Sequence, residues 1–216
     1  MEQRAYHRFL LVKDHFYTDP NRVVLAAQQA EYYEPQEVTG FRSTTVYHEP
    51  GIKQKLEKTL GIKITRWDTD PIAENGVFYH GFSKGNKKEV PGVHSDFPIN
   101  DITVLIYLSK HVPLECGTSL WMHKKFELID QPTASDARRL KMKLSDIKNQ
   151  LEVDSKQRSK WIEVDRVGHV FNRMVAYPSG AFHSATNHFG SNMKNGRIYQ
   201  TYRIGVDWDS FKLIKK

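Results

Sequence analysis

The feature that most constrains the fold of this chain is a series of short segments, rich in β-branched and aromatic residues, that begins near Lys63. Glycine, proline and asparagine separate them, and each segment has the length and composition of a strand. They are KITRWD, GVFYHGF, DITVLIYLSK, GTSLWMH, FELID, HVFNRMVAYPSGAFHSA and GRIYQTYRIGVDW. Many short strands in series predict a mostly β domain of the sandwich or barrel type.

Two helices are expected before this β-rich part. Residues 20–33 are predicted to form the first, because Asp19 is suited to cap a helix and Pro20 to open it. The second is expected in EPGIKQKLEKTLGIK, where apolar residues recur at helical spacing and Gly61 can end the helix.

Residues 133–160 are predicted to be a helical insertion between strands. The apolar residues of SDARRLKMKLSDIKNQLEV recur at helical spacing after a possible cap at Ser135. The segment from Arg138 to Lys160 has a surplus of basic residues. A solvated helix face explains this surplus more simply than a substrate-binding lid does.

Length and composition favour one domain over residues 1–216, with residues 1–62 as helical support. The 216 residues contain no apolar run that would suit a membrane span or a secretory signal, so we expect a soluble, cytoplasmic protein. The lone Cys116 cannot form an internal disulfide and is expected to be a small buried residue. The formal net charge of +7 fits an anionic small molecule, an acidic peptide or nucleic acid equally well.

The stretch GVHSDFPIN contains a candidate metal site. In an extended segment the side chains of His94 and Asp96 point to the same side, with Cα atoms roughly 6 to 7 Å apart. Together they supply two thirds of the two-histidine, one-carboxylate triad that holds Fe(II) on one face. His183, which follows a Pro-Ser-Gly turn, is the expected third ligand, and His188 is its rival.

The last predicted strand carries two arginines on one face. By alternation Arg197, Tyr199, Thr201 and Arg203 point to the same side. An arginine that points into a β core needs an anionic partner, because an unpaired buried guanidinium is unfavourable. A dicarboxylate cosubstrate would be such a partner.

In their order these features resemble the Fe(II)/2-oxoglutarate-dependent oxygenases, in particular the prolyl 4-hydroxylase-like branch with its small microbial and viral members. The resemblance is carried by His94-Ser95-Asp96, by GTSLW, by YPSGAFHSA and by GRIYQTYRI, and FLLVKDHFYTDPNRV resembles the opening strand and helix. It implies a double-stranded β-helix, also called a jelly roll, with iron near one open end.

Carried over to this sequence, the resemblance implies roles for individual residues. His94, Asp96 and His183 would bind Fe(II), and Arg197 would pair with the distal carboxylate of 2-oxoglutarate. The interval from His183 to Arg197 is longer than usual in the family, which leaves Arg203 as an alternative. The hydroxyl groups of three residues could donate to the cosubstrate: Tyr79, Tyr107 and Thr201. The alternative is that these are ordinary strand residues.

The implied reaction uses O₂ and 2-oxoglutarate, hydroxylates an aliphatic C–H bond, and releases succinate and CO₂. An amino acid or a peptidyl side chain is the expected substrate. Near the metal motif Lys84, Lys87 and Lys88 hint at an anionic substrate, although a solvated lysine loop is the simpler explanation. Two alternatives remain: a cupin-like zinc protein or hydrolase, and a basic nucleic-acid-binding module without enzymatic activity.

Overall fold

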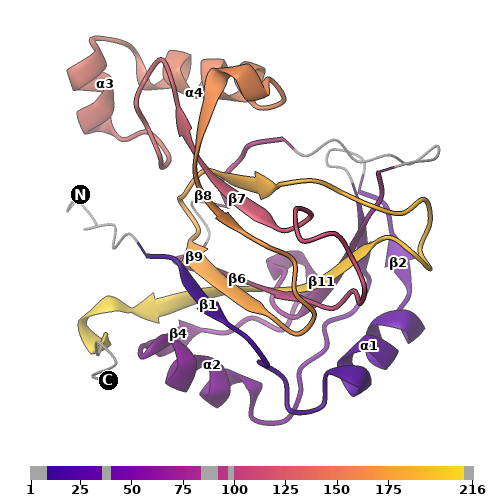
Figure 1. Ribbon diagram of the computed structural model, residues 1–216. Helices are drawn as coiled ribbons and strands as arrows, with labels where there is room; N and C mark the ends of the chain where they lie inside the picture. Colours follow the sequence, from indigo (N-terminus) through magenta and orange to yellow (C-terminus); the bar gives the residue numbers. More distant parts are fainter. Residues whose placement is uncertain (1–8, 36–39, 84–91, 97–99, 212–216) are drawn as a thin grey trace.

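A computed structural model describes residues 9–35, 40–83, 92–96 and 100–211, and two antiparallel sheets dominate it (Figure 1). In the larger sheet the strand order is β1-β9-β6-β11-β5-β3-β2, and β4 also pairs with β11. In the smaller sheet the order is β10-β7-β8. The strands of the larger sheet are β1 (Leu11–Lys13), β2 (Tyr32–Tyr33), β3 (Phe41–Ser43), β4 (Lys63–Arg66), β5 (Val77–Gly81), β6 (Ile102–Tyr107), β9 (Met174–Pro178) and β11 (Arg197–Asp207). Those of the smaller sheet are β7 (Thr118–His123), β8 (Trp161–Val167) and β10 (His183–Ala185).

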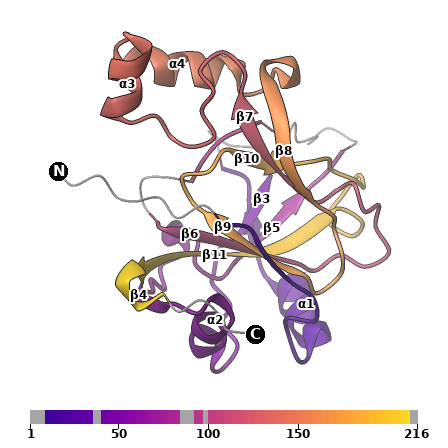
Figure 2. The ribbon, with the colours of Figure 1, turned by 60° about the vertical axis from the view of Figure 1, so that its left-hand side comes forward.

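The elements are arranged in four layers (Figures 1 and 2). The two sheets face each other, and α1 (Pro20–Gln29) and α2 (Ile52–Leu60) cover the outer face of the larger sheet. On the smaller sheet lie α3 (Ala134–Leu140) and α4 (Leu144–Asp154). Short 3-10 helices occur at Pro71–Ala73 (η1), Arg158–Lys160 (η2) and Trp208–Ser210 (η3). The architecture is a mostly β double-stranded β-helix, which confirms the predicted fold class.

The first helix begins as predicted but is shorter. The side chain of Asp19 accepts a hydrogen bond from the Arg22 amide at 3.2 Å, and Pro20 is the first helical residue. The helix ends at Gln29, whereas the prediction extended it to residue 33. Residues Tyr32–Tyr33 instead form β2, because their backbone pairs with β3. The second helix matches its prediction, with Gly61 in the left-handed conformation at its end.

The predicted insertion consists of two helices. Thr133, rather than Ser135, caps the first, because its side chain and that of Asp136 form a reciprocal capping box. The left-handed backbone at Lys141 then ends α3 before α4 begins. The apolar side of α4 packs against residues of and around the smaller sheet, among them Trp121, Phe126, Trp161 and Phe182. Its other side is exposed and mixes Lys148 with Asp146 and Glu152, so it is a solvated helix face without a basic surplus.

Two expectations about strands were wrong. FELID forms no strand, because Leu128 and Asp130 make only isolated bridges, to His123 and Ala181. Conversely, Trp161–Val167 forms β8, which the sequence did not signal because its exposed side mixes charged residues with Ile162 and Val164. β8 pairs with β7 along its length and completes the smaller sheet.

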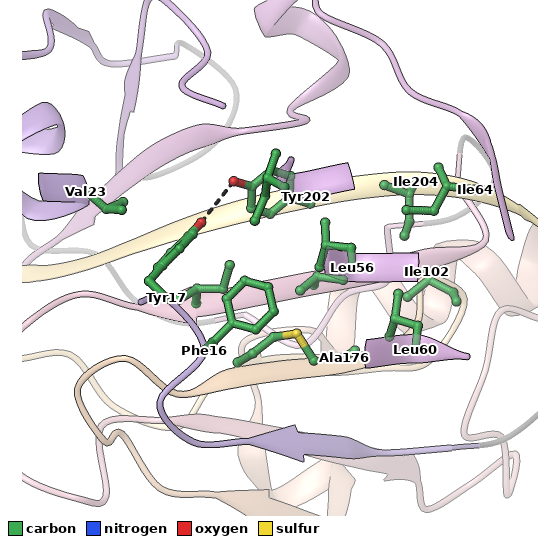
Figure 3. Close-up of a cluster of buried hydrophobic side chains, with 14 of the residues drawn as sticks. Phe16, Tyr17, Val23, Leu56, Leu60, Ile64, Ile102, Ala176, Tyr202 and Ile204 are labelled. Carbon is green, nitrogen blue, oxygen red and sulfur yellow. Dashed lines mark hydrogen bonds between the residues drawn. The ribbon is translucent and has the colours of Figure 1, made fainter. Parts of the chain in front are cut away.

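The main hydrophobic core lies between the larger sheet and its two helices (Figure 3). Two tyrosine hydroxyls of this core bond to other side chains: the hydroxyl of Tyr17 donates to Gln200 at 2.5 Å and lies 2.9 Å from the hydroxyl of Tyr202. The inner face of the same sheet, which meets the smaller sheet, buries Leu105, Tyr107, Val175 and Tyr177. Cys116 is buried, as predicted. Among the described residues no helix is long and apolar enough to cross a membrane.

Candidate metal centre

Two distant segments bring His94 and His183 side by side. Each residue's amide donates to the other's carbonyl, at 2.9 and 2.8 Å, in an isolated antiparallel bridge. The amide of Asp96 donates to the Ser179 carbonyl, which holds its side chain at the same place. One potential ligand atom from each of His94, Asp96 and His183 lies within 4.8 Å of the others. These are the three residues that the sequence predicted as ligands.

Both imidazoles are oriented with Nε2 toward the aspartate. The Nδ1 atom of His94 lies 3.0 Å from the Gly92 carbonyl, and that of His183 lies 3.0 Å from the Ala181 carbonyl. A carbonyl only accepts, so each Nδ1 carries the hydrogen and each Nε2 keeps a lone pair. The Nε2 atoms are 3.9 and 3.4 Å from the carboxylate oxygens of Asp96. Three lone pairs therefore converge, as a cation requires.

The charge state of the cluster also suits a cation. Burial alone would raise the pKa of Asp96, but the guanidinium of Arg203 and the two imidazoles hold that pKa well below its usual value. Burial lowers the pKa of His183 to about 4, so this imidazole is neutral at pH 7. The donor set at neutral pH is thus one carboxylate with at least one neutral imidazole. The side chain of His94 is 57% exposed, which leaves the cluster accessible from that side.

Both oxygens of Asp96 are held by other side chains. The Thr103 hydroxyl donates to Oδ2 at 2.8 Å, and a guanidinium nitrogen of Arg203 donates to Oδ1 at 2.7 Å. Arg203 also pairs with Glu74. The remaining contacts of Glu74 are with the Tyr79 hydroxyl and with Nε of Arg42, the latter at 3.2 Å. Sequence reasoning missed Glu74, because it lies in a turn that carries no motif.

Arg197 has different surroundings, although it lies on the same face of β11. It is only 2% exposed, and its guanidinium donates to the carbonyls of Cys116 and Gly117 at 3.1 and 3.3 Å. It also lies 4.4 Å from the centre of the Tyr199 ring. Within the described part of the chain, no carboxylate pairs with it. A buried cation without a counter-ion fits the carboxylate of a ligand.

The other predicted residues line the same interior. The hydroxyl of Tyr107 donates to Thr118 at 2.7 Å, that of Tyr79 bonds Glu74, and Thr201 is buried between the two arginines. His188 does not join the metal cluster. It is buried, and burial together with the charges of Arg197 and Arg158 lowers its pKa to about 3.

Tyr177 was not predicted. Its ring centre is 4.7 Å from that of His183, and its hydroxyl is buried without a hydrogen-bond partner among the described residues. The register of β9 against β6 places this hydroxyl in the interior, and no sequence motif marks it.

Comparison with known proteins shows the same fold in oxygenases. No family model and no curated protein sequence matches the chain. A prolyl hydroxylase from Trichoplax adhaerens, solved with a peptide fragment of the hypoxia inducible factor oxygen degradation domain, is 12% identical with a TM-score of 0.52, over 96% of this chain and 87% of that one. HygX from Streptomyces hygroscopicus, solved with nickel and 2-oxoglutarate bound, is 10% identical with a TM-score of 0.51, over 96% and 89%.

At these identities the likeness concerns the fold. The fold and the cluster together define the class: a double-stranded β-helix with a candidate two-histidine, one-carboxylate metal site at one end of its interior. The resemblance that the sequence suggested is thereby confirmed at the level of the fold.

Proposed function

We propose that this protein is an Fe(II)- and 2-oxoglutarate-dependent oxygenase that hydroxylates an aliphatic C–H bond. One observation carries the proposal: a His-Asp-His cluster lies on the inner face of one double-stranded β-helix together with a buried arginine that has no carboxylate partner among the described residues. The first fits a divalent metal and the second fits a dicarboxylate. HygX, which has this fold, was solved with a divalent metal and 2-oxoglutarate.

In this proposal His94, Asp96 and His183 hold the iron on one face. Three protein ligands would leave the metal accessible to cosubstrate and oxygen. Iron and 2-oxoglutarate would supply the oxidising chemistry, in which the cosubstrate becomes succinate and CO₂. The chain itself contributes orientation and exclusion of water: hydrogen bonds fix both imidazoles and the carboxylate, and aromatic and aliphatic side chains line the interior.

Arg197 is the proposed partner of the distal carboxylate of 2-oxoglutarate. The sequence left Arg203 as the alternative, but Arg203 already pairs with Asp96 and Glu74. Arg197 keeps its charge uncompensated among the described residues, so it gains more from an incoming carboxylate. Tyr79, Tyr107 and Thr201 remain proposed neighbours of the cosubstrate.

An amino acid or a peptidyl side chain is the proposed substrate. The prolyl hydroxylase with the same fold was solved with a peptide fragment, which supports a peptidyl side chain as one of the two. Lys84, Lys87 and Lys88, which hinted at an anionic substrate, lie outside the described residues.

The test is an anaerobic titration of metal-free protein with Fe(II) and then 2-oxoglutarate, followed by visible absorption. Wild type should develop the charge-transfer band of a chelated keto acid, and His183→Ala should abolish it. His188→Ala is the matched control, because it removes a buried imidazole five positions later and should keep the band. If the wild type develops no band and binds no 2-oxoglutarate in calorimetry, a zinc site or a non-enzymatic module becomes the better interpretation.

A further inference from the structure

Glu74 is a partly buried acidic residue in an unusual backbone position. It ends η1, with φ 51° and ψ 36°, in the left-handed region that glycine and asparagine occupy at lower cost. Its side chain is only 16% exposed. A sparsely populated backbone conformation destabilises the fold and occurs most often at functional sites, so the contacts of the Glu74 side chain are of interest.

The carboxylate of Glu74 connects to the metal cluster through one side chain. One oxygen accepts from Tyr79 and Arg42, and the other pairs with a terminal nitrogen of Arg203. The second terminal nitrogen of Arg203 donates to Asp96 at 2.7 Å. The guanidinium therefore bridges two carboxylates, and each fixes its orientation for the other.

The charges of this network determine how strongly the cluster attracts a cation. Among the described residues two guanidinium groups, of Arg42 and Arg203, face two carboxylates, of Glu74 and Asp96, and the four charges of this network cancel. Without the charge of Glu74 it becomes a net cation that touches a metal-binding oxygen. Such a cation repels a divalent ion and competes with it for the electrons of Asp96.

We propose that Glu74 is a positioning residue of the metal site: through Arg203 it orients Asp96 and neutralises the guanidinium that would otherwise weaken metal binding. The inference rests on the proposed function, because it assumes that the cluster binds a divalent metal. It goes further in assigning to a residue 22 positions before Asp96 a part in holding that metal.

The experiment measures Co(II) binding to metal-free protein by visible absorption, without 2-oxoglutarate or substrate. Glu74→Gln keeps the size of the side chain and removes its charge, and it should weaken Co(II) binding about tenfold or more, as loss of a partner of a metal ligand usually does. Asp14→Asn is the matched control. It removes one carboxylate from the Arg173 pair, at the end of β9 remote from Ser179, and should change binding less than about twofold.

A double-variant comparison separates positioning from general damage to the fold. In an Arg203→Met protein, adding Glu74→Gln should cause no further loss of Co(II) binding, because Glu74 acts through that guanidinium. The inference would be overturned if Glu74→Gln lowered the Co(II) affinity of the Arg203→Met protein by the same factor as that of the wild type. It would also be overturned if Glu74→Gln alone bound Co(II) like the wild type. If the wild type binds no Co(II), the proposed function fails as well. If binding is lost in His183→Ala but unchanged in Glu74→Gln, only this inference fails.

Discussion

Buried polar groups on the two faces of β11 differ in the partners that they find. On the outer face the hydroxyl of Tyr17 donates to Gln200 and also lies within hydrogen-bond distance of the Tyr202 hydroxyl. These groups lie inside a core of aliphatic and aromatic side chains. On the inner face Arg197 is equally buried but has no carboxylate partner among the described residues. Burying a charge without an opposite charge destabilises the fold, so the inner face fits an anion that the described residues do not supply.

The two arginines of the inner face refine this contrast. Arg203 pairs with two carboxylates, one of them Asp96 of the candidate metal site, whereas Arg197 contacts carbonyls and aromatic rings. Identical residues on one strand face thus have different roles because their surroundings differ. The following changes test the contrast, beginning with the largest expected effect.

Arg197→Met should weaken 2-oxoglutarate binding by about 2 to 5 kcal/mol, because it removes a desolvated charge-assisted pair. Metal binding should stay close to that of the wild type, since Arg197 makes no contact with the cluster. Calorimetric titration of Ni(II)-loaded protein with 2-oxoglutarate measures the effect. Arg203→Met should show the reverse, a larger change in metal affinity than in 2-oxoglutarate affinity. Wild-type affinity for 2-oxoglutarate in Arg197→Met would break the contrast.

His80, on the outer face, should contribute to the pH dependence of the free energy of unfolding and should not affect ligand binding. Burial lowers its pKa from 6.5 to about 4. The folded state therefore excludes a proton that the unfolded state binds, so stability is complete above pH 6.5 and falls as the pH drops from 6.5 toward 4. In His80→Phe the loss of unfolding free energy between pH 7 and pH 5 should shrink by about 1 to 2 kcal/mol.

Urea unfolding of the metal-free protein at the two pH values measures this difference. The buried His169 and His188 have pKa values lowered to about 3, so some loss should remain in the variant. An unchanged pH dependence in His80→Phe would contradict the prediction, and so would a loss of 2-oxoglutarate binding.

Tyrosine hydroxyls should give opposite results on the two faces. Tyr177→Phe removes a buried hydroxyl without a described partner, so the free energy of unfolding of metal-free protein should stay the same or rise by up to about 1 kcal/mol. Tyr202→Phe breaks the contact with Tyr17 and should lower it by about 1 kcal/mol. Urea unfolding at pH 7 compares the two, and equal losses would show that the inner hydroxyl is satisfied after all.

Much of this organisation follows from short-range patterns. The sequence Asp19-Pro20 placed the start of α1, Gly61 placed the end of α2, and alternation put Arg197 and Arg203 on one face of a strand. The spacing of His94 and Asp96 likewise implied side chains that act together. Each of these features depends on backbone geometry within a few residues, which the sequence encodes directly.

Local patterns failed where another segment competes for the backbone. Tyr32 and Tyr33 have no strong signal against a helix, but pairing with β3 makes them a strand. Thr133 rather than Ser135 caps α3, because Asp136 stands three residues after Thr133 and completes a capping box. FELID makes only isolated β-bridges and no ladder. Propensity is a weak preference that tertiary contacts override.

By itself, then, the sequence determined the β-rich architecture, the flanking helices and the short motif His94-Ser95-Asp96. The tertiary structure decided that His183 rather than His188 faces that motif and that Arg203 bridges Asp96 to Glu74. It also decided that Arg197 has no acidic partner within the described part of the chain. The physical reason is distance along the chain. Caps and alternation are properties of neighbouring residues, whereas these contacts depend on the register of strands that meet only once the two sheets have formed.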